Sequence, residues 1–235
     1  MKKSILTLAI AGVLASSAFS QGLIAFSGGI SASTRISTNS VVGGPATGRA
    51  SSVAGTFYMA LFASAANTSI NGNTAAISGT NANYVFNNLA GWTLVGIATN
   101  TTTAGGFVAA SQGTSDASQA ALNGDGSLSV SSVAGGANAQ IVAVAWSATI
   151  GSTLTSLEQW YNSGSPSTFG LIGQSAISGA LTLGNGALVG TPQAFGPSPS
   201  TPGFLIGGVT PTPEPGTLAL CALGGASMLL FRRKK

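Results

Sequence analysis

The chain has 235 residues, only 5% of them charged, with one cysteine and no histidine. Its formal net charge of +4 comes from the two ends, because six of the eight basic residues lie at positions 2–3 and 232–235. Up to residue 210, the part between carries two arginines against three acidic residues, a balance of 2 − 3 = −1. We therefore expect no nucleic-acid binding, since no basic patch is available to neutralise phosphates.

The first 20 residues are predicted to be a signal peptide. Two lysines precede an apolar stretch over 5–14, and small residues follow at Ala18 and Ser20, which occupy the −3 and −1 positions of a cleavage site before Gln21. A retained membrane anchor is the alternative, but the apolar stretch is short and a cleavage site follows it. With no cysteine near this site, a lipoprotein is excluded.

Residues 21–189 are predicted to form an exported, all-β, sandwich-like domain with one short helix. β-branched and aromatic runs alternate with Gly, Asn and Ser clusters, while Lys and Glu, which favour surface helices, are nearly absent. Strands are expected at 56–62, 92–98, 127–131 and 140–146, and a weaker one at 169–176. Turns are expected at 71–72, 87–88 and 123–126.

The one helix is expected to begin near Thr155, where Thr155-Ser-Leu-Glu158 fits a capping box. Leu154, Leu157 and Tyr161 would then share its apolar face, with Trp160 beside them. Gly164 and Pro166 would end it.

The composition changes at residue 190, because seven of the nine prolines lie at or after Pro192. Residues 190–210 are therefore predicted to be an extended, Pro-rich spacer. Residues 204–206 could still add a final strand.

The domain is not expected to be an enzyme, and we assign no catalytic residue, metal site or cofactor. It has no His, Cys or Lys, so nucleophile–base pairs and zinc or copper sites cannot be built from it. Asp116, Asp125 and Glu158 remain as acid–base candidates. The first two lie in Ser/Gly-rich turns and Glu158 is assigned a capping role. The loop 123–127 faintly resembles a calcium loop, but a plain turn is favoured.

Aromatic side chains could serve either as sugar-stacking platforms or as core, and the core is favoured because large side chains are scarce. The six candidate rings are Trp92, Trp146, Trp160, Tyr58, Tyr84 and Tyr161. The threonine-rich segment 99–103 lacks a regular spacing and is interpreted as a polar loop.

The segment 211–235 has three parts in order: Pro213-Glu214-Pro215, an uncharged apolar stretch over 217–231, and four cations. The stretch predicts a short transmembrane helix, and the cations that follow it predict a cytoplasmic C-terminus. These cations are Arg232, Arg233, Lys234 and Lys235. Cys221 lies within the stretch and is interpreted as apolar filler.

These three parts resemble the PEP-CTERM sorting signal of Gram-negative bacteria. The sequence departs from that pattern at Thr212, where Val is usual, and in the two lysines of its basic end. The resemblance covers about the last tenth of the chain. It implies recognition by an exosortase, a membrane-embedded, transpeptidase-like enzyme that removes the tail.

The sequence thus predicts a protein that is exported across the inner membrane, anchored there transiently, and then located at the cell surface or outside the cell. Its expected partners are the Sec machinery, an exosortase and, transiently, the membrane. The first hypothesis for its function is a structural or interaction protein of the surface or the extracellular polymeric substance. The alternative is a carbohydrate-binding module or adhesin that uses the same route and has extracellular polysaccharide as its partner.

Overall fold

The computed structural model describes residues 21–28, 34–39, 48–103, 106–109, 127–163, 168–185 and 190–209. This part of the chain is mostly β-strand, with one α-helix and two short 3₁₀ helices, which confirms the expected β-rich domain with one helix. The predicted signal peptide and the predicted helix over 217–231 lie outside it. The elements are β1 (Gln21–Ala25), β2 (Ser27–Gly28), β3 (Ser37–Thr38), β4 (Gly48–Arg49), β5 (Phe57–Ser64), β6 (Ile77–Ser78), η1 (Val85–Asn87), β7 (Thr93–Asn100), β8 (Phe107–Ala109), β9 (Ser127–Ala134), β10 (Asn138–Ser147), η2 (Ala148–Ile150), α2 (Leu154–Asn162), β11 (Gly170–Gln174), β12 (Leu181–Thr182) and β13 (Leu205–Val209).

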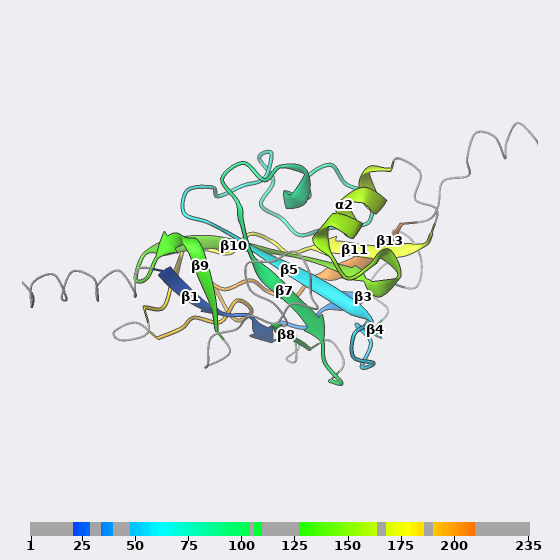
Figure 1. Ribbon diagram of the computed structural model, residues 1–235, viewed down its shortest axis with the longest axis horizontal. Coiled ribbons are helices and arrows are strands. Elements are labelled where there is room, and N and C mark those ends of the chain that lie inside the picture. Colours follow the sequence, from blue (N-terminus) through cyan, green and yellow to red (C-terminus); the bar gives the residue numbers. More distant parts are fainter. Residues whose placement is uncertain are drawn as a thin grey trace, which may run out of the picture.

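The centre of the fold is a large twisted sheet in the order β2-β8-β7-β5-β10-β11-β13-β3-β4 (Figure 1). β5 and β10 form its longest antiparallel pair, which runs from Phe57↔Ser147 to Ser64↔Gln140. β13 pairs antiparallel with β11 on one side and parallel with β3 on the other. A second sheet consists of β1 and β9.

The central strands are buried on both faces, as predicted from their apolar residues. On β10, Val142, Val144 and Trp146 point to one face and Ala143 and Ala145 to the other. The fold therefore has an apolar core on each side of the sheet. We call them the helix-side core, which contains Trp146, and the strand-side core, which contains the alanines.

β1 and β9 close the strand-side core. Their apolar positions alternate with exposed or half-buried ones, so that Ile24, Leu128 and Val130 are fully buried. Phe26 stacks on Phe195, with ring centroids 6.2 Å apart. This packing confirms the half-buried strand expected around 127–131.

α2 and the irregular segment 65–92 close the helix-side core. Figure 1 shows α2 on one side of β5 and β10, and β1 with the gold trace of residues 190–200 toward the other. Leu154, Leu157 and Trp160 are the buried residues of the helix. Tyr161, expected on the same face, packs against this core from a half-buried position.

The predicted helix start is wrong by two residues. The N-cap is Thr153, whose Oγ1 accepts a hydrogen bond of 3.0 Å from the Ser156 N–H. Thr155 already lies inside the helix and is exposed. Both threonines are followed by residues that suit a first turn, but only Thr153 has the extended backbone that an N-cap needs.

The prediction of a Pro-rich spacer over 190–210 is also wrong. Residues 190–209 belong to the domain, because Ala194, Phe195, Phe204 and Ile206 are part of the strand-side core. The backbone of this segment exchanges hydrogen bonds with Ala25 of β1. Its prolines stiffen a packed loop that leads into the final strand, β13, whose existence was expected.

The turn predicted at Asn71-Gly72 is present. Both residues have positive φ, 50° and 77°, and the flanking Ile70 and Asn73 exchange backbone hydrogen bonds of 2.9 Å. This is the conformation that an Asn-Gly pair favours in a tight hairpin. The turn expected at 87–88 is the end of η1, and the one at 123–126 lies outside the described residues.

Candidate functional site

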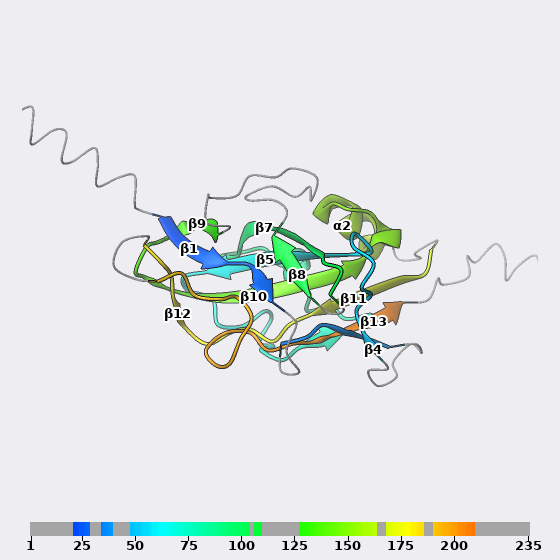
Figure 2. The same ribbon diagram turned by 90° about the horizontal axis from the view of Figure 1, so that it is seen from below.

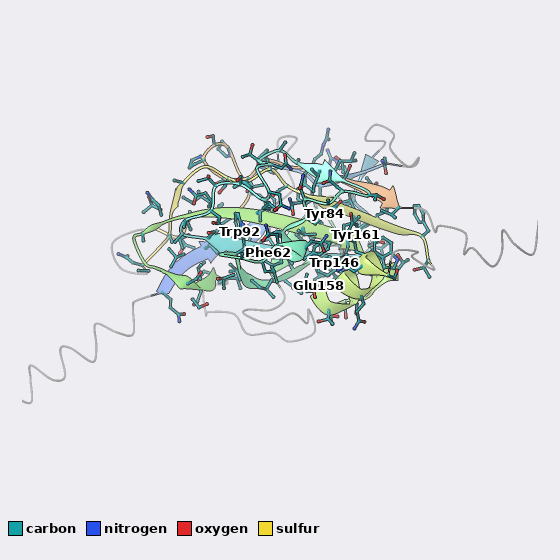
Figure 3. The ribbon with its side chains drawn as sticks, turned by 90° about the horizontal axis from the view of Figure 1, so that it is seen from above. Phe62, Tyr84, Trp92, Trp146, Glu158 and Tyr161 are labelled. Carbon is teal, nitrogen blue, oxygen red and sulfur yellow. The ribbon has the colours of Figure 1, made fainter. Side chains whose placement is uncertain are left out.

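The six candidate rings do not form a platform on the surface. Trp146 and Tyr84 are fully buried, Trp92 and Trp160 are nearly so, and Tyr58 and Tyr161 are half-buried against the same core. Figure 3 shows Tyr84, Tyr161 and Trp146 close together near α2. The core interpretation of these rings is therefore confirmed.

Three rings join the helix to the segment that covers the core. Tyr84 stacks on Phe86 at 5.2 Å, and Tyr161 meets both rings edge-on at 5.2 and 5.4 Å. The Tyr84 hydroxyl donates a hydrogen bond of 2.8 Å to the Gly79 carbonyl. The Tyr161 hydroxyl accepts one of 2.6 Å from the Asn81 N–H and also donates to the Asn81 carbonyl.

Burial raises the pKa of both tyrosines. For Tyr84 the main cause is desolvation, with a smaller contribution from Tyr161. For Tyr161 desolvation outweighs the hydrogen bond to Asn81, which acts in the opposite direction. Both phenols therefore stay protonated near neutral pH, and their bonds to the backbone give them a structural role.

Gln174 at the end of β11 fastens the same segment. Its Oε1 accepts a hydrogen bond of 2.7 Å from the Val85 N–H, and its Nε2 donates one of 3.2 Å to the Asn83 carbonyl. The side chain is buried, so both bonds replace water. Sequence reasoning missed this residue, although a lone amide in the apolar stretch 170–174 is a signal that could have found it.

Asn100, the last residue of β7, has a corresponding role for the segment that precedes β5. Its Oδ1 accepts hydrogen bonds of 2.9 Å from the N–H groups of Thr56 and Phe57, and its Nδ2 donates to the carbonyls of Ser51 and Val53. The expectation of a polar loop over 99–103 is therefore wrong at its start. Thr99 and Asn100 belong to β7.

Glu158 is the one acidic side chain among the described residues, and it lies half-buried on α2 (Figure 3). Because the helix starts at Leu154, Glu158 lies beyond the first turn and does not cap it. Burial raises the pKa of its carboxyl. The other two candidate carboxylates, Asp116 and Asp125, lie outside the described residues. Within the ranges that the structure describes, no group of three or more potential metal ligands occurs.

A shallow groove of about 370 Å³ lies between residues 177–179 and the loop 196–202. Serine, glycine and proline line it, together with Ile177. These side chains offer hydroxyls but no charged group.

The two arginines of the domain lie at its edge. Arg49 belongs to β4 and is exposed, and Arg35 precedes β3 and is half-exposed. β3 and β4 are antiparallel with Ser37 opposite Arg49, and the Ala50 N–H donates a hydrogen bond of 2.9 Å to the Ile36 carbonyl. Two cations on consecutive strands are thereby brought to one ribbon, which sequence reasoning did not predict.

Most targeting residues predicted from the sequence lie outside the described residues. They are Ala18, Ser20, Pro213, Glu214, Pro215, Arg232, Arg233, Lys234 and Lys235. Gln21, the residue expected after signal cleavage, is described and is the first residue of β1. The helices in the described ranges are all too short or too polar to cross a membrane. No family model, curated protein or solved structure matches this chain.

Proposed function

We propose that the chain is an exported structural or interaction protein of the cell surface or extracellular matrix, delivered by a sorting signal of the PEP-CTERM kind. The observation that carries the proposal is the order of three parts in 211–235: Pro213-Glu214-Pro215, an uncharged stretch and four cations. The prolines keep the first part extended and out of the helix, which suits a protease that acts at a membrane face.

The described strands are compatible with removal of both ends. The predicted signal cleavage leaves Gln21 as the first residue, and β1 begins there. β13 ends at Val209, before the Pro-Glu-Pro part. Cleavage at both places would therefore leave every described strand intact.

The side chains of the domain favour a structural or interaction role. Its described part offers one half-buried carboxylate and neutral, hydrogen-bonded phenols, and this is not a set that performs acid–base or nucleophilic catalysis. The alternative of a carbohydrate-binding module loses its proposed stacking platform, because the rings fill the helix-side core.

The decisive experiment is the intact mass of the protein isolated from a host that contains an exosortase. We expect a product that starts at Gln21 and lacks everything after the Pro-Glu-Pro part. Glu214→Ala should leave a longer form in the membrane, because it removes the one acidic charge beside the stretch. Thr212→Val, which brings the segment closer to the usual pattern, is the matched control and should be processed like the wild type.

A wild-type product that ends at Lys235 and stays with the inner membrane would overturn the proposal and indicate a permanent anchor. Export is tested separately by a reporter that works only outside the cytoplasm, fused after Val209 so that all described strands precede it. Its inactivity would contradict the predicted topology.

A further inference from the structure

The two arginines of the domain point away from the core on the same face of the β3–β4 ribbon. Ile36 and Ala50 are fully buried in the strand-side core. Since side chains alternate along a strand, Arg35, Ser37 and Arg49 face the other way. Ser37 lies opposite Arg49, so Arg35 and Arg49 are diagonal neighbours, which typically lie about 7–8 Å apart.

No described carboxylate neutralises this pair. Glu158 is the only acidic side chain in the described ranges, and it belongs to α2. Figures 1 and 2 both place α2 well away from β4. Among the described residues nothing offsets the weak repulsion between these two cations in water, and a bound anion would do so.

Protection of a sheet edge explains only half of the arrangement. β4 is the last strand of the sheet, and a charged residue such as Arg49 discourages edge-to-edge pairing. Arg35 precedes β3, which has β13 on one side and β4 on the other. A charge at that position protects no free edge.

Arginine also has a specific chemistry. Its planar guanidinium forms two parallel hydrogen bonds to one carboxylate, which a lysine cannot do. Ser37 lies opposite Arg49 and carries a hydroxyl that suits a sugar hydroxyl group. Two cations are too few for a nucleic acid, which binds through many phosphate contacts, and too few for an anionic membrane surface.

We infer that the outward face of the β3–β4 ribbon binds an acidic polysaccharide, with Arg35 and Arg49 each holding a carboxylate of the polymer. The inference rests on the proposed function in that such a polymer belongs to an extracellular matrix. It adds the ligand class and the residues that bind it. The aromatic rings take no part, since they are buried on the helix side.

The test measures binding of the purified full-length chain, in mild detergent, to polygalacturonate at a physiological ionic strength of about 0.15 M. Arg35→Ala/Arg49→Ala should weaken binding about ten-fold or more, because each arginine contributes a charge-assisted pair of hydrogen bonds. Arg232→Ala/Arg233→Ala removes the same number of charges from the other end of the chain. It is the matched control and should change the affinity by no more than about two-fold.

A second variant keeps the test valid if the alanine variant folds poorly. Arg35→Lys/Arg49→Lys retains both charges but loses the paired hydrogen bonds. We therefore expect its affinity for polygalacturonate to fall by an amount between the losses of the alanine variant and the control. The melting temperature of each variant is measured alongside. Neutral dextran should not bind to any of them.

Three results would overturn the inference. One is wild-type affinity in the lysine variant, and another is an equal loss in the ribbon and tail variants. The third is arginine-dependent binding of double-stranded DNA as tight as that of polygalacturonate. Because the measurement uses purified chain, it does not depend on tail cleavage, and failure of the sorting proposal can be recognised separately by mass analysis.

Discussion

The two cores of this domain are closed by different means. On the strand side, β1, β9 and the segment 190–206 cover the sheet with Ile, Leu, Val, Phe and Ala, which have no polar atoms in their side chains. Backbone bonds hold these covers in place, such as the pair of 2.8 and 2.9 Å between Leu23 and Gly184. The helix-side core is closed by α2 and the irregular segment 65–92, and it contains all three tryptophans and the buried Tyr84.

The helix-side cover lacks a continuous backbone ladder, and side chains supply its hydrogen bonds. Trp146 Nε1 donates to the Gly151 carbonyl at 2.8 Å, and Trp160 Nε1 donates to the Thr168 carbonyl at 3.2 Å. Gln174 and Tyr161 hold the segment 81–85. A strand satisfies its own backbone by pairing, whereas a loop over a core needs polar side chains beneath it. The distribution of Trp, Tyr and Gln between the two cores follows from this requirement.

The largest effect is expected from Trp146→Ala. The side chain is fully buried on β10, and its removal leaves a cavity and an unpaired Gly151 carbonyl. The free energy of unfolding should fall by about 3–5 kcal/mol, measured by urea denaturation. Val108→Ala, at an exposed position on β8, is the control and should stay within about 0.5 kcal/mol of wild type. A loss no greater than that of the control would contradict the assignment of Trp146 to the core.

Gly22→Ala tests the strand-side core. A Cβ at this position would lie 2.4 Å from Leu183 Cδ1 and 2.7 Å from Leu183 Cβ. We expect a loss of about 1–3 kcal/mol from overpacking. Gly48→Ala is the matched control, because a Cβ there meets no atom within 4 Å. An equal stability of the two variants would show that β1 is not packed as described.

The same variant shows whether the two cores unfold together. Tryptophan emission reports the helix-side core alone, because all three tryptophans lie there. Far-UV circular dichroism reports the strands. If the sheet makes one cooperative unit, Gly22→Ala shifts both urea transitions equally. Separated midpoints would mean that the strand-side cover opens by itself.

Gln174→Leu tests the polar attachment of the helix side. The change leaves the Val85 N–H and the Asn83 carbonyl without their partner, which should cost about 1–3 kcal/mol. The Val85 amide should also exchange its hydrogen faster. Asn73→Ala is the control, since Asn73 likewise bonds to a loop through both ends of its amide, but it is only half-buried and its bonds are exposed to solvent. If the two variants lost similar amounts of unfolding free energy, the burial of Gln174 would not be what makes its hydrogen bonds stabilising.

Thr153→Ala should cost about 1 kcal/mol, because it removes the oxygen that caps α2. Thr155→Ala at the neighbouring, exposed helical position should be close to neutral. The comparison is made by urea denaturation at constant pH. A larger loss of stability for Thr155→Ala than for Thr153→Ala would contradict this assignment. It would support the capping box suggested by the sequence, with the helix starting two residues later.

The smallest effect concerns the pH dependence due to Glu158. Burial raises its pKa in the folded state, so the folded protein binds the proton more tightly than the unfolded chain does. The stability from this site is fully present below the ordinary carboxyl pKa of about 4.3 and declines as pH rises through the raised pKa. Glu158→Gln should remove that decline from a plot of unfolding free energy against pH. An unchanged slope would indicate that the carboxyl is solvated.

The strands were predictable because their signals are local. In β10, valines and tryptophan alternate with alanines, and this alternation alone assigns the two faces. The turn at Asn71-Gly72 depends on two residues that tolerate positive φ. The helix was predictable from Leu154, Leu157 and the residues that follow, but its cap was not. Two threonines were available, and the path of the chain into the helix selects between them.

The sequence by itself determined a β-rich domain with few charges, the position of its one helix and the three-part order of residues 211–235. Only the tertiary structure decided that residues 190–209 complete the strand-side core and that Gln174 and Asn100 fasten loops. It also decided that Arg35 and Arg49 share one face. The reason is distance along the chain: Gln174 binds the backbone of a residue 89 positions away, and Asn100 binds one 44 positions away. Local patterns of polarity report whether a side chain is buried, but its partner depends on which distant strands the fold places side by side.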